Sequence, residues 1–167
     1  MGTLIVVEGD KVEGTDKHNI SGTGTLPPPP PSGTPGTPFT GIADFDYKGS
    51  MTDELSDMVS IGGKAAALVS SKSSLDPGED SAGGHAPTSA KNIHETPTMI
   101  PVSRVVTAIT DAIGTGVPSA GTGSSFVKVD GNAVLLDGDS IDTCDGLSIP
   151  MNSTVTSENQ DFVSCSE

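Results

Sequence analysis

The stretch from Phe126 to Asp139 reads Phe-Val-Lys-Val-Asp-Gly-Asn-Ala-Val-Leu-Leu-Asp-Gly-Asp. Two β-rich runs flank Asp130-Gly131-Asn132, and a Gly-Asp pair closes the stretch. Asp-Gly between two such runs is a strong hairpin signal, because the turn needs positive φ angles and glycine adopts them without strain. The stretch therefore predicts a strand, a tight turn, a second strand and a further turn.

The same pattern occurs earlier in the chain, from Met58 to Val69 (Met-Val-Ser-Ile-Gly-Gly-Lys-Ala-Ala-Ala-Leu-Val). Both copies read hydrophobic-Val-polar-β-branched-x-Gly-polar-Ala-x-x-Leu. A third, rougher copy lies near the start, where Val6 to Val12 parallels Leu135 to Ile141. We expect the two hairpins to fold together into one small unit.

Length and composition favour a single, mainly β domain over residues 1–167. Only 33% of the residues are hydrophobic, with four Phe, one Tyr and no Trp, whereas Gly (21) and Pro (13) are abundant. Such a chain cannot build a large core, so it should consist of short β-hairpins with long Pro/Gly-rich loops. We expect a metal, a disulfide or a partner to contribute to its stability.

The formal net charge of −14 argues against binding to nucleic acid or to anionic membranes, both of which need basic patches. No apolar run approaches the roughly 20 residues that span a bilayer. The first residues lack a basic region followed by an apolar segment, so no secretory signal is visible. The sequence therefore predicts synthesis in the cytoplasm without a signal peptide, and no stable membrane anchor.

Two segments interrupt the hairpin pattern. Residues 21–38 are Pro-rich, which predicts an extended surface segment, either a linker or, as the less favoured alternative, a peptide ligand for an aromatic groove. Residues 102–113 place apolar side chains on one face of a 3.6-residue period, which predicts a short helix. Their β-branched residues disfavour a helix and leave a strand as the alternative.

The repeated hairpin resembles the proteins named for a Pro-Ala-Ala-Arg (PAAR) repeat, whose strands read hydrophobic-Asn-Gly-Lys-Pro-Ala-Ala-Arg-Val-Gly-Asp. Ile61 to Val69 is similar to this phrase, with Ala65 in place of the proline and Leu68 in place of the arginine. Val129 to Asp139 fits its full length. Neither copy keeps the four letters intact, and residues 95–122 look like an insertion.

The resemblance implies a conical spike-tip protein of a contractile injection system, such as a phage tail, a type VI secretion system or a phage-tail-like particle. Such a protein docks as one monomer on a trimeric β-helical spike, sharpens it and helps to pierce the target envelope. It is carried at the tip of the particle, is delivered outside the cell or into the target on contraction, and in some cases carries a toxin. The alternative is an acidic secreted or surface binding module, adhesin-like and without metal.

The resemblance also implies a structural zinc or iron ion held by histidines and a cysteine. One Cys and three His complete a tetrahedral site, and a pointed tip has too little volume for a core, so metal bonds would hold its loops together. Cys165 is an alternative thiolate, whereas a disulfide between the two cysteines is disfavoured in the cytoplasm. The expected ligands are His18, His85, His94 and Cys144.

Apolar residues of the hairpins are expected to form the docking base. No set of side chains with the spacing of a catalytic site is evident, so we expect no enzyme activity. A further alternative is a small metal-dependent hydrolase, which would need an open ligand position on its metal and would lose activity on chelation. The candidate docking residues are Ile61, Leu68, Val127, Val129 and Leu135.

Overall fold

β-strands make up most of the residues that the structure describes, which confirms the mainly β prediction, although two strands of 15 and 17 residues are longer than the short hairpins expected. The computed structural model describes residues 2–25, 31, 33–79, 84–95, 103–111, 113–143 and 153–165. Within them the helical element is a single 3₁₀ turn, η1 (Pro87–Ser89), and no helix is long and apolar enough to cross a lipid bilayer. The strands are β1 (Thr3–Leu4), β2 (Lys11–Thr25), β3 (Thr37–Asp53), β4 (Ser60–Ile61), β5 (Lys64–Ala65), β6 (Lys72–Leu75), β7 (Lys91–Glu95), β8 (Ser103–Ile109), β9 (Thr115–Pro118), β10 (Lys128–Val129), β11 (Asn132–Ala133), β12 (Ser140–Asp142), β13 (Ser153–Thr156) and β14 (Ser164–Cys165).

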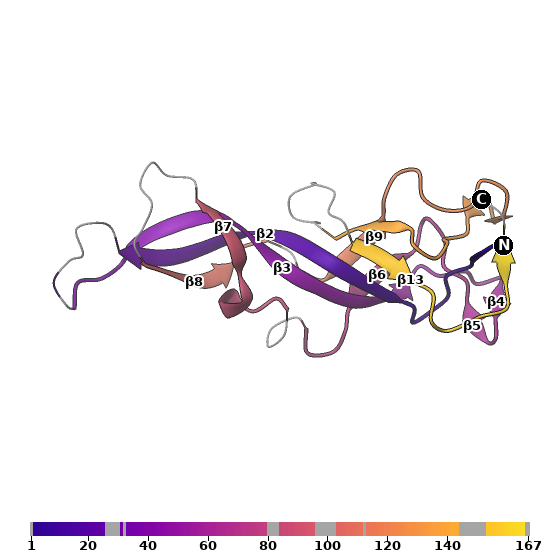
Figure 1. The fold of residues 1–167 in the computed structure, drawn as a ribbon, viewed down its shortest axis with the longest axis horizontal. Coiled ribbons are helices and arrows are strands. Elements are labelled where there is room, and N and C mark those ends of the chain that lie inside the picture. Colours follow the sequence, from indigo (N-terminus) through magenta and orange to yellow (C-terminus); the bar gives the residue numbers. More distant parts are fainter. Residues whose placement is uncertain are drawn as a thin grey trace.

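The molecule has a head, which carries both ends of the chain, and a twisted ribbon that projects from it (Figure 1). The long strands β2 and β3 pair antiparallel and run through both parts. In the head, six strands close on themselves in the order β2, β3, β6, β9, β12 and β13, with β13 paired to β2 again. In the ribbon, β7 pairs with β3 and β8 pairs with β2.

Three short segments, 5–7, 66–68 and 134–136, close a second and smaller cycle in the head, which we call the threefold ring. The last residue of each segment pairs with the first residue of the next segment around the ring: Val7 with Ala66, Leu68 with Val134, and Leu136 with Ile5. The middle residues are joined by three backbone N–H to carbonyl hydrogen bonds of 2.9–3.0 Å, from Val6 to Leu135, from Ala67 to Val6 and from Leu135 to Ala67. The ring therefore has approximate threefold symmetry within one chain.

Each segment of the ring is followed by the same turn. A side-chain oxygen three residues further on accepts the backbone N–H of the last ring residue, at 2.7–2.9 Å. The pairs are Val7 with Asp10, Leu68 with Ser71, and Leu136 with Asp139. The equivalence of residues 6–12 and 135–141, visible in the sequence, is thus also present in the hydrogen bonds.

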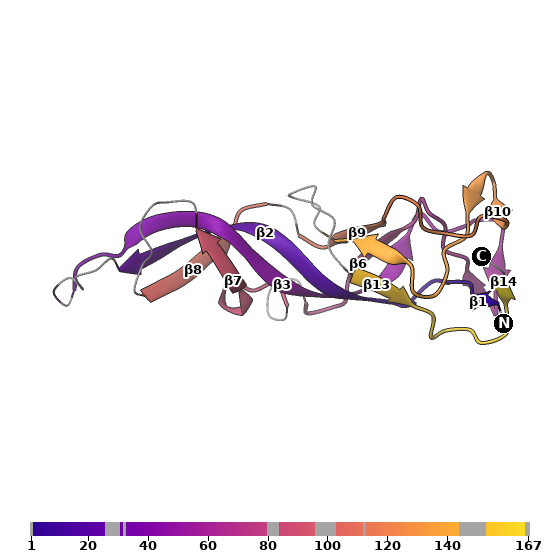
Figure 2. The ribbon, with the colours of Figure 1, turned by 45° about the horizontal axis from the view of Figure 1, so that its top comes forward.

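A β-hairpin precedes each ring segment, and the three hairpins lie together at the outer end of the head, which we call the base (Figure 2). Two of them are β4–β5 and β10–β11. The second has positive φ angles at Asp130 (49°) and Gly131 (82°), as the Asp-Gly signal predicted. In the third, β14 and β1 pair in the same way, although they come from distant parts of the sequence.

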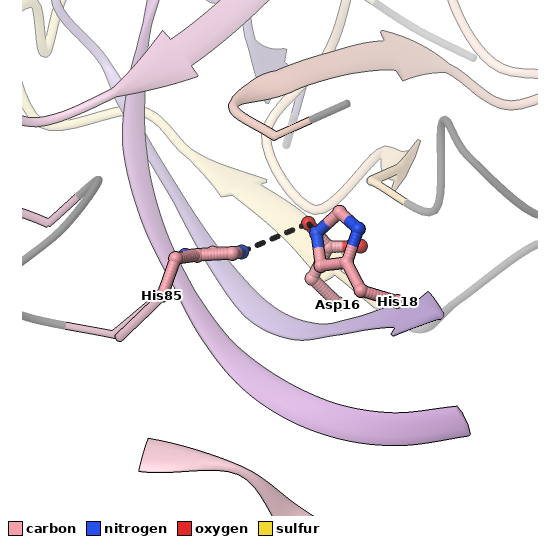
Figure 3. Close-up of side chains that lie close together, drawn as sticks. All are labelled: Asp16, His18 and His85. Carbon is pink, nitrogen blue, oxygen red and sulfur yellow. Dashed lines mark hydrogen bonds and ion pairs between the residues drawn. The ribbon is translucent and has the colours of Figure 1, made fainter. Parts of the chain in front are cut away.

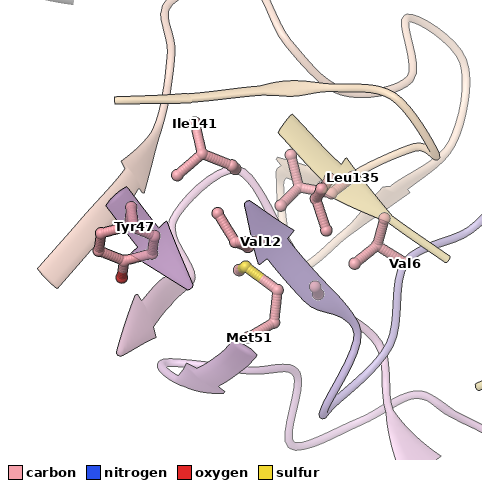
Figure 4. Close-up of a cluster of buried hydrophobic side chains, with 8 residues drawn as sticks. Val6, Val12, Tyr47, Met51, Leu135 and Ile141 are labelled. Atoms are coloured by element: carbon pink, nitrogen blue, oxygen red, sulfur yellow. The ribbon is translucent and has the colours of Figure 1, made fainter. Parts of the chain in front are cut away.

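The buried apolar residues form three clusters rather than one core. One lies between the threefold ring and the ribbon and contains Val6, Val12, Tyr47, Met51, Ala67, Leu135, Ile141 and Val155 (Figure 4). A second gathers residues of all three repeats near the base, namely Ile5, Val7, Ile61, Leu68, Val134 and Leu136. The third lies in the ribbon and contains Ile20, Phe39, Ala43 and Phe45.

Glycine is required where β3 pairs with both β2 and β6. Gly49 is opposite Val12 on one side and Leu75 on the other. A Cβ atom at Gly49 would collide with the carbonyl oxygen of Ser74 on β6. Glycine at this position therefore allows β3 to pair with β6 while it also pairs with β2.

The structure corrects two expectations from the sequence. The helix predicted at 102–113 is wrong, because residues 103–109 form strand β8, whose β-branched side chains suit an extended backbone. The Pro-rich segment 21–38 is strand at both ends, since residues 21–25 belong to β2 and residues 37–38 to β3. Residues 26–30 and 32 of that segment lie outside the described part.

Truncating the ring residue Leu135 tests the fold. Leu135 is 0% exposed, so Leu135→Ala should lower the free energy of unfolding by about 2–5 kcal/mol through lost contacts and a cavity. Phe126→Ser, at a side chain that is 73% exposed, should change it by about 0.5 kcal/mol or less. Urea unfolding followed by circular dichroism measures both, and equal effects would contradict the assigned burial.

Candidate functional site

Three side chains that can bind a metal meet inside the molecule: Asp16, His18 and His85 (Figure 3). We call them the metal cluster. The Nε2 atoms of His18 and His85 each lie 3.0 Å from the same oxygen, Oδ2 of Asp16. The three candidate ligand atoms lie within 4.8 Å of one another. The side chains are 0–1% exposed, so the cluster is shielded from solvent.

Strand geometry explains why these residues meet. Asp16 and His18 are two residues apart on β2, so their side chains lie on the same face of the strand. His85 comes from the loop between β6 and η1, and its backbone N–H donates to the carbonyl oxygen of Glu79 at 3.0 Å. The rings of Phe45 and His85 stack at 5.7 Å, and the Phe45 ring lies edge-on to His18 at the same distance. The loop histidine is therefore positioned by aromatic packing.

Asp111 orients His18 from the other side. Its Oδ1 lies 2.9 Å from Nδ1 of His18, while its Oδ2 accepts from the backbone and side-chain amides of Asn19 at 2.9 Å. Histidines that bind metals usually donate their second ring N–H to such an acceptor, which fixes the tautomer. With Nδ1 directed to Asp111, Nε2 is the ring nitrogen that faces the centre of the cluster, where it could bind a metal in the neutral form of the ring.

The contacts also set the protonation of the cluster when no metal is bound. Burial alone would lower the pKa of His18, but the hydrogen bond to Asp16 and the charges of Asp16 and Asp111 outweigh it and raise this pKa above the ordinary 6.5. Burial alone would raise the pKa of Asp16, but hydrogen bonds from His18 and His85 outweigh it and lower this pKa below 3.8. The two acidic side chains that flank His18 therefore favour its protonated form.

The donor set suits a divalent metal ion. Ligand atoms around tetrahedral zinc lie about 3.3 Å apart, close to the two 3.0 Å separations seen here. Two imidazoles and one carboxylate are also a known donor set for ferrous iron. Nδ1 of His85 is buried and has no hydrogen-bond partner among the described residues, which is unusual for a polar atom in a closed interior. The cluster can therefore hold a metal ion.

The structure brings together two of the four predicted metal ligands. His18 and His85 are in the cluster, whereas His94 lies on β7 opposite Ile42 with an exposed side chain. Cys144 lies outside the described residues, and the alternative ligand Cys165 is a free cysteine on β14 at the base. Asp16 was not among the ligands predicted from the sequence. The spacing Asp-x-His on one strand was the available signal.

Among the described residues of the base, the three most exposed apolar side chains come one from each repeat, and we call them the apolar triad. They are Met58 (78% exposed), Phe126 (73%) and Phe162 (64%). Each lies two residues after a polar residue whose side-chain oxygen accepts its backbone N–H at 3.2 Å: Ser56, Ser124 and Gln160.

The triad lies beside the hairpins of the base. A Cβ atom at Gly62, in the β4–β5 turn, would lie 3.6 Å from the Phe162 ring. Met58 and Asp130 of the β10–β11 turn line one groove. The equivalent hydrogen bonds therefore hold the three side chains at related positions around the base.

The predicted docking residues differ in their exposure. Ile61 and Leu68 are buried near the base, and Val127 and Val129 are partly buried against them. Leu135 cannot take part in docking, because it is fully buried in the cluster on the ribbon side of the threefold ring. Successive side chains of a strand point to opposite faces, and both faces of the ring segments are apolar. The sequence pattern therefore did not show which of these residues face the base.

Metal binding should depend on the cluster and not on histidine content. His85→Ala and Asp16→Ala should each lose stoichiometric zinc, because two ligands bind far more weakly than three. Asp111→Asn should weaken zinc binding about 10- to 100-fold. His94→Ala is the matched control and should bind zinc as the wild type does. Competition with a chromophoric chelator measures the affinities, and loss of zinc in His94→Ala alone would contradict the assignment.

Without metal, the cluster predicts a defined dependence of stability on pH. Because the pKa of His18 is raised in the folded state, its ionisation contributes to the free energy of unfolding. This stabilisation is complete below about pH 6.5 and is lost as the pH rises through the folded-state pKa. The lowered pKa of Asp16 gives a second stabilising contribution. It is complete above about pH 3.8 and is lost as the pH falls through the folded-state pKa of Asp16. The stability advantage of chelated wild type over His18→Gln should therefore be largest between these values. Urea unfolding at pH 5.5 and 8.5 measures it, and a larger advantage at pH 8.5 would contradict the contacts of His18.

Comparisons with protein-family models, with curated proteins and with solved structures each found no match for this chain.

Proposed function

We propose that this protein caps a threefold-symmetric spike, as a structural tip of a contractile injection system. The base would dock on the end of a trimeric β-helical spike, and the ribbon would project forward. One chain would bind per trimer, because one chain already contains three equivalent docking elements. The work of such a tip is mechanical, and it requires no catalytic group.

The observation that carries the proposal is the threefold repetition of the base. An exposed patch of large apolar side chains usually marks an interaction site, and three such side chains at equivalent positions match a partner with three equivalent sites. The residue that supports each triad side chain donates a hydrogen bond to a carbonyl oxygen of the threefold ring, Ser56 to Ala66, Ser124 to Val134 and Gln160 to Ile5. Rigid presentation lowers the entropic cost of docking.

The metal cluster supports a structural role rather than a catalytic one. A catalytic metal keeps a ligand position open to substrate, whereas these three side chains are 0–1% exposed. A bound zinc ion would connect β2 to the loop that carries His85, and through Asp111 to the segment that follows β8. These segments are distant in the sequence, so the ion would tie the ribbon together where its apolar core is small. The proposed ion is zinc, with ferrous iron as the alternative.

Charged residues in place of the apolar triad should abolish docking. The partner for the test is the trimeric β-helical spike protein encoded nearest to this gene. Isothermal titration calorimetry should give one chain per trimer, and Met58→Glu, Phe126→Glu and Phe162→Glu should each weaken binding at least about tenfold, since each would bury an unpaired charge.

Val105→Glu provides the matched control. Val105 is also a large exposed apolar residue (59%), but it lies on β8 in the ribbon. This variant should bind the spike with unchanged affinity. Equal weakening by Val105→Glu and the triad variants, or a stoichiometry of three chains per trimer, would contradict docking through the base.

A further inference from the structure

Five-residue segments, which we call arms, lead to the side chains of the apolar triad. Each arm lies beside the turn that follows one segment of the threefold ring. The polar residue of that turn, which already accepts a backbone N–H of the ring, also forms a hydrogen bond with the arm, and this bond differs among the three repeats. The arms are residues 54–58, 122–126 and 158–162, and the turn residues that hold them are Ser71, Asp139 and Asp10.

Asp10 holds the arm that ends at Phe162, and its side chain is buried. Its Oδ2 accepts the backbone N–H of Val7 in the ring at 2.7 Å. Its Oδ1 accepts the backbone N–H groups of Glu158 and Asn159 at 3.0 and 2.9 Å, and the side-chain amide of Asn159 at 2.8 Å. One carboxylate oxygen is therefore used by the ring and the other by the arm.

Asp139 holds the arm that ends at Phe126 with a single oxygen. Its Oδ2 accepts the ring N–H of Leu136 at 2.8 Å and the arm N–H of Gly123 at 2.9 Å. Hydrogen bonds to an ionised carboxylate are stronger than those between neutral groups. The arms of both phenylalanines are thus held by charge-assisted bonds.

Ser71 holds the arm that ends at Met58 through the opposite side of the equivalent peptide group. Its hydroxyl accepts the ring N–H of Leu68 and donates to the carbonyl oxygen of Glu54, both at 2.9 Å. The other two arms present N–H groups at this position. Glu54 also has a φ angle of 53°, in the left-handed region that residues other than glycine rarely adopt. A neutral bond and a strained residue hold this arm less firmly than carboxylates hold the other two.

We propose that Asp10 and Asp139 are positioning residues for docking, each of which fixes one phenylalanine as an anchor, whereas the arm of Met58 adapts to the partner. This inference rests on the proposed function, because it concerns the contacts that the base would make with the spike. A side chain that is already held in place loses little conformational freedom on binding. Methionine, with its flexible chain, fits irregular surfaces. The partner should therefore present equivalent apolar pockets that accept a phenyl ring.

The first test is spike binding by full-length variants, measured by isothermal titration calorimetry. Asp10→Asn should weaken binding about tenfold, because an amide has one acceptor oxygen and its NH₂ group would face an N–H of the ring or of the arm. Asp139→Ala should weaken it to a similar extent, and Asp139→Asn should restore part of the loss, since one oxygen suffices there. Asp46→Asn, an exposed residue of β3 in the ribbon, removes the same charge and should bind as the wild type does.

Double-mutant cycles separate positioning from a general loss of stability. Asp10→Asn should change the affinity less than about twofold when Phe162 is already replaced by Ala, but still about tenfold when Phe126 is replaced. Asp139→Ala should show the reverse, and it decides the question if Asp10→Asn does not fold by circular dichroism. The same loss in both backgrounds, or unchanged affinity in both Asp10→Asn and Asp139→Ala, would overturn the proposal.

Hydrogen exchange of the free protein distinguishes a failure of this inference from a failure of the proposed function. In Asp10→Asn, the N–H of Phe162 should exchange at least about tenfold faster, while that of Phe126 keeps its rate. If the wild type does not bind the spike, docking fails as a function, but this selective change would still support Asp10 as the residue that positions the arm. Equal acceleration at both arms would overturn that role whether or not the spike binds.

Discussion

The structure depends on a closed cycle of three backbone hydrogen bonds among Val6, Ala67 and Leu135. These residues are distant in the sequence, and each one both donates to and accepts from a neighbour in the ring. Closure pairs each of the three described ring segments with both of its neighbours. These segments therefore do not expose the free edges that an open sheet of this size would have. It also holds the three hairpins of the base, and with them the apolar triad, at related positions. The function that we propose for the base is a consequence of this cycle.

Between the threefold ring and the ribbon, hydrogen bonds between buried side chains supplement the small apolar core. The hydroxyl of Tyr47 lies 2.9 Å from that of Ser73, and Thr143 and Ser153 pair at 2.8 Å, all of them buried. Burial raises the pKa of Tyr47 to about 12, so this hydroxyl stays neutral and keeps its hydrogen bonds. The metal cluster continues this polar interior into the ribbon. A chain with few large apolar residues can be stable in this way only if its buried polar groups are paired, as Asp16 is with both His18 and His85.

The sequence was sufficient to predict the mainly β fold and the repeated hairpin, because the signals are local. Asp130-Gly131 specifies a turn, and the shared pattern of the two copies follows from equivalent positions in the ring. The third repeat was only partly visible, since its hairpin is formed by β1 and β14 from opposite ends of the chain. Asp16 and Asp111 were missed for a related reason. Their contacts with His18 depend on the long strand β2 and on the segment after β8, neither of which the Gly- and Thr-rich sequence indicates.

Hydrogen exchange of the backbone amides, resolved by NMR, tests the ring most directly. If the cycle is the foundation of the fold, the N–H groups of Val6, Ala67 and Leu135 should all exchange in the slowest class, at the rate of global unfolding. Exchange of Val6 at the rate of surface loops, with Ala67 and Leu135 protected, would show that the repeat formed by the chain ends does not close the ring. That result would contradict the threefold base and the function built on it.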